Sequence, residues 1–255
     1  MRPLVLALGM LAAFPALGAA CAAVSGEGTA ALVELYTSEG CDSCPPADRW
    51  LSSLPEHGYV PSKVVPLSLH VDYWDYIGWK DPYAKPAFSA RQRKLTQLQR
   101  LAFVYTPQVM LQGQDFRAWR TPAFDAAVAR INAEPARARI ALSIEAVGKE
   151  KLTAAVRADV LDRGQLRQAA LYLASYENRL ASAVSAGENR GRTLKHDYVV
   201  MEWLGPLELP SGTAAERREI PLLPKAIPAN SGVVAFVQNR RSLQVLQALM
   251  LAVCP

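Results

Sequence analysis

Two cysteines separated by two residues, Cys41 and Cys44, have the types and spacing that best fit redox chemistry in this sequence. An apolar run at 31–36 precedes them and predicts a buried strand, and Pro45 and Pro46 after them predict the first turn of a helix. A helix N-terminus lowers the pKa of a cysteine placed there, because backbone N–H groups and the dipole stabilise the thiolate. The pattern therefore predicts a nucleophilic thiolate at Cys41 and a resolving thiol at Cys44.

The same pair allows other interpretations. A C-x-x-C pair can be half of a zinc site, but the sequence has no second such pair, and its histidines, His57, His70 and His196, are widely spaced. Two thiolates can also hold Cu(I), a soft ion that prefers sulfur, or the pair can be a structural disulfide in a non-catalytic binding protein. Redox exchange needs no metal or other cofactor, and Cu(I) enters only under the copper-handling alternative.

Length and composition indicate an ordinary globular protein. The chain has 255 residues, 51% hydrophobic and 20% charged, which is enough for one large or two modest domains. Its net charge of +5 comes from basic residues scattered among 23 acidic ones. We therefore expect a mildly basic surface and protein thiol or disulfide partners, not a nucleic-acid interface.

The N-terminus predicts export. Arg2 precedes an apolar run at 4–20 followed by small residues, which is typical of a signal peptide spanning 1–22 with cleavage after Ala20 or Ala22. Acylation at Cys21 is the alternative, although no large apolar residue lies three positions upstream. We expect a periplasmic or extracellular protein with no stable membrane span, in a compartment where disulfides persist. Cys21 and Cys254 can then tie the two ends of the chain together.

The region 28–135 alternates predicted strands and helices. After the first strand and the helix at 43–56, an apolar strand at 63–71 leads into an aromatic and acidic segment at 72–83. A helix at 86–100 follows, and then Thr106 and Pro107. The remaining predicted elements are the strands 108–111 and 115–119 and the helix 122–133.

This order, with C-x-x-C at the first helix and Thr106-Pro107 before the third strand, resembles the thioredoxin fold. The resemblance implies that Pro107 is cis and packs against the cysteine pair, where substrate backbone binds next to Thr106. The run V-E-L-Y also resembles the thioredoxin strand whose acidic residue assists proton transfer to the buried cysteine. Glu34 is the matching residue, although its connection to Cys41 is one residue longer than in thioredoxin.

Several longer segments resemble the exported proteins of the domain of unknown function (DUF) 1223 family. They are E-L-Y-T-S-E-G-C-D-S-C-P-P-A-D, H-V-D-Y-W-D-Y-I-G-W-K-D-P, V-Y-T-P-Q-V-M and N-R-G-R-T-L-K-H-D-Y-V-V. This resemblance supports a thioredoxin-like first half and implies no substrate.

The region 136–255 changes character to short alternating segments separated by turn residues, which predicts an all-β, immunoglobulin-like sandwich domain. At 243–251 a helix competes with a strand. The polar residues Asn189, Arg190, Arg192, Lys195 and His196 fit a long hairpin loop with solvated charges, although a ligand site is also possible there. The expected strands are 138–147, 151–160, 168–175, 193–203, 217–222, 232–238 and 243–253.

Four further residues lie at the end of the second strand or just after it and are candidates for the site, because open α/β sheets place their sites at the carboxyl ends of strands. His70 can stabilise a thiolate or simply bind backbone groups. Asp72 can act as a base or cap the loop that follows. Tyr73 and Trp74 can form an apolar platform for substrate or cover the rim of the site.

Overall fold

The computed structural model describes residues 21–148, 150–223 and 226–254. The expected signal peptide lies outside the described residues, apart from Cys21 and Ala22 at the start of the first strand. Within these ranges, no helix combines the length and the apolar character needed to cross a bilayer.

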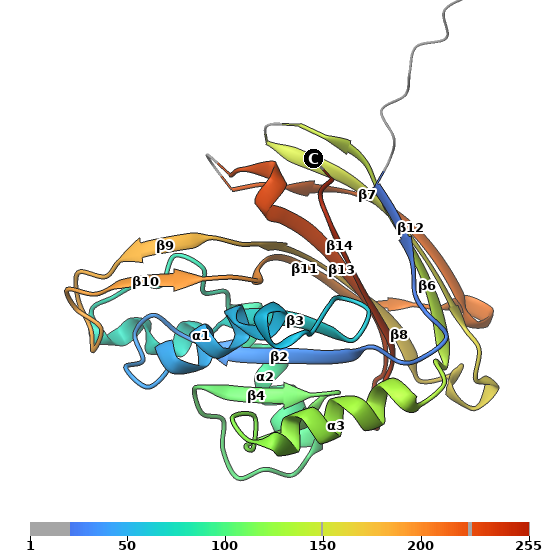
Figure 1. Cartoon of the computed structure of the whole chain (residues 1–255), viewed down its shortest axis with the longest axis horizontal. Helices are drawn as coiled ribbons and strands as arrows, with labels where there is room; N and C mark the ends of the chain where they lie inside the picture. The colour runs from blue at the N-terminus through green and yellow to red at the C-terminus, as the bar shows by residue number, and fades with distance from the viewer. Residues whose placement is uncertain (1–20, 149, 224–225, 255) are drawn as a thin grey trace, which may run out of the picture.

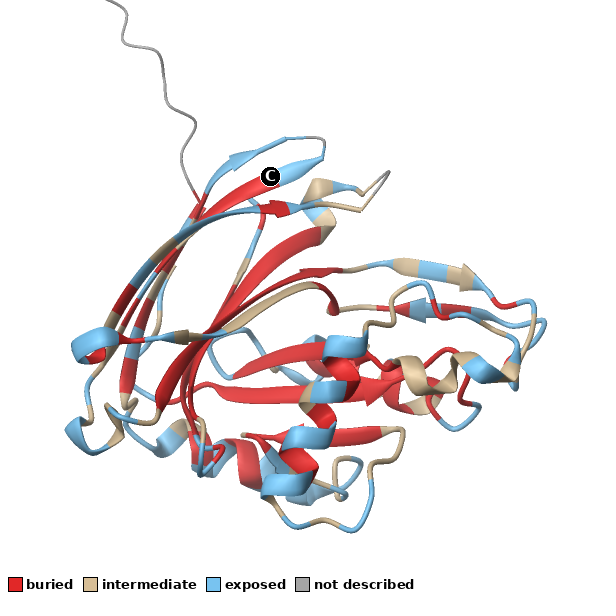
Figure 2. Cartoon of the chain, turned by 180° about the vertical axis from the view of Figure 1, so that it is seen from behind, coloured by how far each residue is buried: buried red, intermediate tan, exposed pale blue. Residues whose placement is uncertain are grey.

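A large sheet carries the C-x-x-C pair. In the described part of the chain it has eight strands, in the order β14-β13-β8-β11-β3-β2-β4-β5 (Figure 1). Strand β2 pairs in parallel with β3 and antiparallel with β4. Both β2 and β3 are buried along their whole length, as expected for strands covered on both faces (Figure 2). The strands from the first half are β2 (Ala31–Thr37), β3 (Val64–His70), β4 (Gln108–Leu111) and β5 (Gln114–Asp115).

The alternation of side chains along β2 decides which helix each residue meets. Val33 and Leu35 pack in the apolar cluster that contains residues of α1 and α3. Leu32 and Tyr36 pack in the cluster on the other face, which contains residues of α2. Each α-helix has proline in its first turn. The helices are α1 (Pro45–Ser52), η1 (Leu54–His57), η2 (Asp72–Ile77), α2 (Pro86–Leu98) and α3 (Pro122–Ala133).

The second half of the chain extends the large sheet. Strand β11 pairs in parallel with β3 at Val199 and Ser68, and the Ser68 N–H donates to the Tyr198 carbonyl at 2.8 Å. The expected boundary between 135 and 136 therefore does not separate two sheets. The sequence pattern could not show this, because it identifies strands but not their partners. The strands contributed by the second half are β8 (Ala169–Glu177), β11 (Val199–Glu208), β13 (Ser231–Asn239) and β14 (Val245–Ala252).

A small sheet packs against these later strands. Among the described residues it has four strands, in the order β1-β6-β7-β12. Its inward side chains, such as Ile140 and Leu142, share one apolar cluster with Leu171 and Val233 of the large sheet. The two sheets thus face each other across a common core. Its strands are β1 (Cys21–Val24), β6 (Ala138–Val147), β7 (Lys151–Val160) and β12 (Thr213–Pro221).

A two-stranded hairpin reaches away from the second half towards α1 (Figure 1). It consists of β9 (Leu180–Ala183) and β10 (Thr193–His196), and its C-terminal end leads almost directly into β11. The segment expected as one strand at 193–203 is therefore β10 and β11 with a break between them. The remaining short helices are η3 (Arg163–Gln165), η4 (Pro210–Gly212) and η5 (Pro228–Asn230).

A disulfide joins Cys21 to Cys254 across 233 positions of sequence. Cys21 begins β1, which pairs antiparallel with β6, and Cys254 follows β14. The bond therefore links an outer strand of the small sheet to an outer strand of the large sheet.

We expect Cys254→Ser to lower the free energy of unfolding by about 2–5 kcal/mol, because a cross-link between distant positions restricts the unfolded chain. Urea unfolding without reductant measures this loss. Cys21→Ser and the double variant should give the same loss, because either change removes the same bond. A double variant clearly less stable than both single variants would contradict this account.

Candidate functional site

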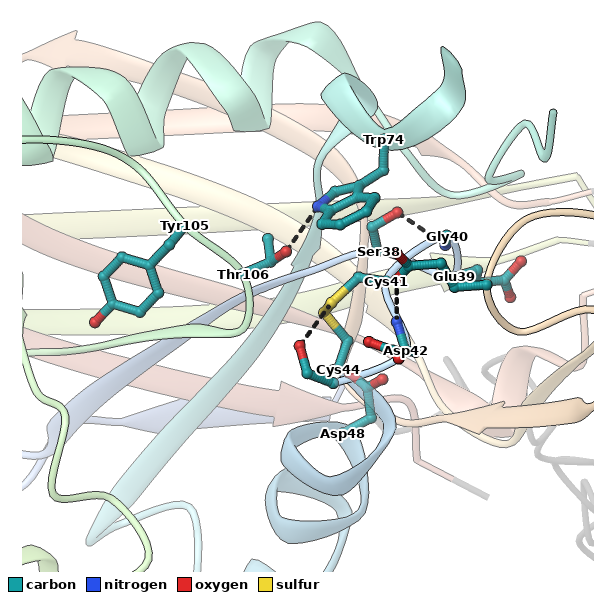
Figure 3. The surroundings of a disulfide bond; sticks show 12 residues. Ser38, Glu39, Gly40, Cys41, Asp42, Cys44, Asp48, Trp74, Tyr105 and Thr106 are labelled. Atoms are coloured by element: carbon teal, nitrogen blue, oxygen red, sulfur yellow. Dashed lines mark hydrogen bonds between the residues drawn. A yellow bond between two sulfur atoms is a disulfide. The ribbon is translucent and has the colours of Figure 1, made fainter. Parts of the chain in front are cut away.

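The C-x-x-C pair lies at the carboxyl end of β2, where a turn leads into α1 (Figure 3). Cys41 and Cys44 form a disulfide with a Cα–Cα distance of 5.4 Å, and Cys44 is the N-cap of α1. Both cysteines have an exposed fraction of 0%. The Ser43 hydroxyl lies 3.3 Å from the Cys41 sulfur. The disulfide is therefore placed at a helix N-terminus but is covered by other parts of the chain.

The loop before β4 lies beside the disulfide. The Thr106–Pro107 peptide bond is cis, and the Trp74 indole N–H donates to the Thr106 hydroxyl at 2.7 Å (Figure 3). Trp74 also packs closely over Gly40, since a Cβ built on this glycine would lie 3.1 Å from the Trp74 Cβ. The structure thus brings Trp74 and Thr106 to the cysteine pair, with the cis bond to Pro107 next in the chain.

Buried acids and imidazoles lie next to the pair. The Glu39 carboxylate accepts a hydrogen bond from the Trp79 indole at 2.8 Å, and its other oxygen lies 3.1 Å from His196 Nε2. The other nitrogen of His196, Nδ1, lies 3.8 Å from Asp48 Oδ2. Glu39, Asp48 and His196 are each exposed by 6% or less. These side chains come from the turn after β2, from α1 and from β10.

A second ion pair adjoins the first group. His70 Nδ1 lies 2.7 Å from Asp81 Oδ2, and both side chains are completely buried. Asp81 also accepts hydrogen bonds from the backbone N–H groups of Glu39 at 2.8 Å and Tyr83 at 2.9 Å. The rings of His70 and His196 meet edge to face, with centroids 4.9 Å apart. Glu39, Asp48, His70, Asp81 and His196 are called the buried acid–imidazole cluster below.

Burial and neighbouring charges shift the titration of this cluster. Burial is the largest single influence on His70 and would lower its pKa, but the carboxylates of Asp81, Asp48 and Glu39 together outweigh it, and the pKa of His70 is raised. Burial is also the largest single influence on Asp81 and would raise its pKa, but His70 and the backbone N–H groups of Glu39 and Tyr83 together outweigh it, and the pKa of Asp81 is lowered. Burial raises the pKa of Asp48, and the nearby His196 and His70 offset this only in part. His70 and Asp81 thus form an ion pair, and burial holds the pKa of Asp48 above its usual value.

The hairpin loop between β9 and β10 holds the turn that contains Cys41. The Asn189 side-chain amide donates to the carbonyls of Glu39 at 2.9 Å and Cys41 at 2.8 Å. The Asp42 N–H donates to the Glu188 carboxylate at 3.0 Å. Asn189 has an exposed fraction of 0%. The hairpin therefore closes over the cysteine pair and restricts access to it.

Glu34 lies elsewhere than its predicted role requires. Its carboxylate binds Arg91 of α2 through two contacts, at 2.5 and 3.0 Å, and both side chains are buried. Arg91 in turn packs against the faces of Tyr172, Trp203 and Phe236. Glu34 faces the α2 side of β2, whereas Cys44 lies on α1, on the opposite face. The carboxylate of Glu34 is thus part of a structural ion pair.

Asp72 and Tyr73 fasten η2 to α2. The Asp72 carboxylate accepts a hydrogen bond from the Ser89 hydroxyl, and the Asp72 N–H donates to the same hydroxyl at 3.2 Å. The Tyr73 hydroxyl donates to the Gln92 side chain at 3.2 Å. Both residues therefore support the segment that carries Trp74.

Sequence reasoning missed most of the buried acid–imidazole cluster. Glu39, Asp48 and Asp81 were not singled out, and Asn189 and His196 were expected in a solvated loop, whereas both are buried. A local signal existed for Asp48, which lies four residues after Cys44 and hence on the same helix face. Among the described residues, no group of three or more His, Cys, Asp or Glu side chains is arranged to hold a metal ion.

A family model described as "Protein of unknown function (DUF1223)" matches residues 32–238. No curated protein matches the chain. Among solved structures, the chain is similar to protein AGR_C_4864 of Agrobacterium tumefaciens, with 22% identity, a TM-score of 0.60, and coverage of 89% of this chain and 96% of that one. It is also similar to HBP35 of Porphyromonas gingivalis, with 18% identity, a TM-score of 0.66, and coverage of 89% and 76%. At such identities these likenesses show the fold alone.

We expect Glu34→Gln to lower the free energy of unfolding by about 3–5 kcal/mol, because it leaves the Arg91 charge buried without its counter-charge. Chemical denaturation measures the loss. Glu219→Gln is a matched control, since Glu219 pairs with Lys151 at an exposed site, and it should change stability little. Equal stability losses in the two variants would contradict the structural role of Glu34.

Proposed function

The chain belongs to the DUF1223 family, and we propose that it is an exported, thioredoxin-like thiol–disulfide oxidoreductase acting on protein thiols or disulfides. The observation that carries the proposal is the Cys41–Cys44 disulfide at the N-terminus of α1, with the Thr106–Pro107 loop beside it. A thiolate at this position is stabilised by the first turn of the helix. The order of elements from β2 to α3 also agrees with a thioredoxin-like unit.

The exchange reaction proceeds in two steps. The Cys41 thiolate of the reduced protein attacks one sulfur of a partner disulfide, forms a mixed disulfide and releases the other partner sulfur as a thiolate. Cys44 loses its proton and attacks the Cys41 sulfur, which expels the second partner thiolate. The cysteine pair is then oxidised to its disulfide, and the partner has gained two electrons. The reverse sequence oxidises a partner dithiol.

Export is part of the proposal. The Cys21–Cys254 bond supports an oxidising compartment, in which such bonds persist. It also favours cleavage after Ala20 over cleavage after Ala22 or acylation of Cys21, because the disulfide requires an unmodified Cys21 thiol.

The burial of the pair favours a second candidate function, that of a structural staple in a non-catalytic binding protein. A glutathione titration of the Cys41–Cys44 pair separates the two. A midpoint of about −120 to −270 mV supports exchange chemistry, whereas one below about −300 mV marks a structural disulfide. A Cys21→Ser/Cys254→Ser background keeps the other pair from contributing to the titration.

We expect Cys44→Ala to accumulate mixed disulfides with partner proteins in the native compartment, because Cys41 can still attack but nothing resolves the adduct. Non-reducing electrophoresis followed by mass spectrometry identifies the adducts. Cys41→Ala is the matched control and should trap few partners. Equal trapping by the two variants, or none by either, would contradict the assignment of Cys41 as nucleophile.

We expect Asn189→Ala to speed reduction of the Cys41–Cys44 disulfide by dithiothreitol, because the hairpin must open before a reductant reaches the sulfur. Loss of the two hydrogen bonds that Asn189 donates to the Glu39 and Cys41 carbonyls weakens closure by roughly 1–2 kcal/mol, or about 5- to 30-fold in the opening equilibrium. Arg190→Ala is the control, since Arg190 is exposed on the same hairpin loop. If both variants are reduced at the wild-type rate, the hairpin does not limit access.

A further inference from the structure

The resolving step needs a proton acceptor inside the protein. Cys44 is completely buried beneath the hairpin, so bulk water has no direct contact with its sulfur. A thiol is a poor nucleophile until it loses its proton. Glu34, the acid expected from the resemblance, is bound to Arg91 on the opposite face of the sheet. The acceptor must therefore come from the α1 side.

We propose that the Asp48 carboxylate accepts the proton of Cys44 during resolution of the mixed disulfide, and that His196 positions Asp48 for this role. The proposal rests on the exchange function proposed above and names the base of its second step. In this step the Cys44 S–H proton passes to an Asp48 oxygen, and the resulting thiolate attacks the Cys41 sulfur. The bond between Cys41 and the partner sulfur breaks, and the partner leaves as a thiolate.

The position of Asp48 on α1 supports the assignment. Asp48 lies one turn after Cys44, and its backbone N–H donates to the Cys44 carbonyl at 3.1 Å. Residues four apart share a helix face, and Figure 3 shows Asp48 on the same side of α1 as Cys44. Asp48 is 6% exposed, and its Oδ1 atom has no hydrogen-bond partner among the described residues. The Thr37 hydroxyl, which likewise has no other partner in the described chain, lies near enough to lower the pKa of Asp48. With no closer donor on Oδ1, this oxygen can take a proton.

The groups that face Asp48 come from several elements. His196 of β10 is nearest, with Nδ1 at 3.8 Å from Asp48 Oδ2, and His70 of β3 also attracts the carboxylate. Asp81, after η2, opposes its ionisation. Glu39 anchors the far nitrogen of His196 at 3.1 Å. Three carboxylates thus share two imidazoles, so one acid of the cluster is without an imidazole of its own.

The titration of Asp48 fits the same role. Burial raises its pKa, which brings the carboxylate closer to the pKa of a thiol and makes proton transfer between them less unfavourable. His196 offsets part of this effect and keeps the carboxylate able to ionise. Thus His196, which lies on β10 in the second half of the chain, lowers the pKa of Asp48, the proposed base for Cys44 in the first half.

A two-phase reaction tests the proposal. The protein, in the Cys21→Ser/Cys254→Ser background so that only Cys41 and Cys44 react, is reduced and mixed with dithiobis-nitrobenzoate, a disulfide whose thiolate product is coloured. Attack by Cys41 releases the first coloured thiolate, and resolution by Cys44 releases the second, so the two steps are timed separately. For Asp48→Asn at neutral pH, we expect a first phase within about twofold of wild type and a second phase slowed at least about tenfold.

The pH profile separates proton transfer from a structural effect. The second phase of Asp48→Asn should recover as pH rises, because a growing fraction of the Cys44 thiol is then ionised without help from a carboxylate. Asp48→Glu keeps a carboxylate and should recover part of the rate at neutral pH. His196→Gln should shift the pH dependence of the second phase. Glu219→Gln, which removes a carboxylate from an exposed ion pair far from the site, is the control and should leave both phases at the wild-type rates.

Two outcomes would overturn the assignment of Asp48. One is a second phase of Asp48→Asn that runs at the wild-type rate. The other is a second phase of Asp48→Asn that is slowed equally at every pH, together with no recovery of the rate in Asp48→Glu. Absence of the first phase in the wild-type protein would instead refute the exchange function itself. The two failures are therefore distinguishable.

Discussion

The pairing of β11 with β3 determines how the rest of the molecule is arranged. Strand β3 has β2 on one side, and β11 occupies its other side through the contact between Ser68 and Tyr198. Because β10 ends at His196 and β11 begins at Val199, this pairing fixes the hairpin at the carboxyl end of β3. The carboxyl end of β2 lies next to it, with Thr37 beside His70. One backbone pairing thus brings Asn189 and His196 to the cysteines.

Local patterns were sufficient for most elements of the first half, although the strand expected at 115–119 is only the two-residue β5 (Gln114–Asp115) followed by a turn. The apolar run before Cys41, the proline-led helices and the segment before β4 all have short-range signals, and each lies close to its expected position. At 245–252, where a helix and a strand competed, the structure has β14, paired along its length with β13. There the partner strand decided the outcome, because a mostly apolar segment, here interrupted by Gln247 alone, gives no clear periodicity of its own.

The site was harder to predict because its polar residues depend on long-range contacts. His196 and Asn189 have polar neighbours in sequence, which is typical of a solvated loop, and their burial follows from the docking of the hairpin on α1. Glu34 illustrates the opposite error. Its place in the V-E-L-Y run suggested a role near the cysteines, but the alternation of β2 turns it towards Arg91 on the other face. The identity of a buried acid did not reveal which face it occupies.

The bond between Cys21 and Cys254 makes the described chain a covalent ring. Cys254 follows every strand of both sheets, so the ring can close only after all of them have been synthesised. Once it has closed, a single cut by a protease in any loop between the two cysteines opens the ring but leaves both pieces joined. A nicked molecule would therefore keep both halves of its site together until the bond is reduced.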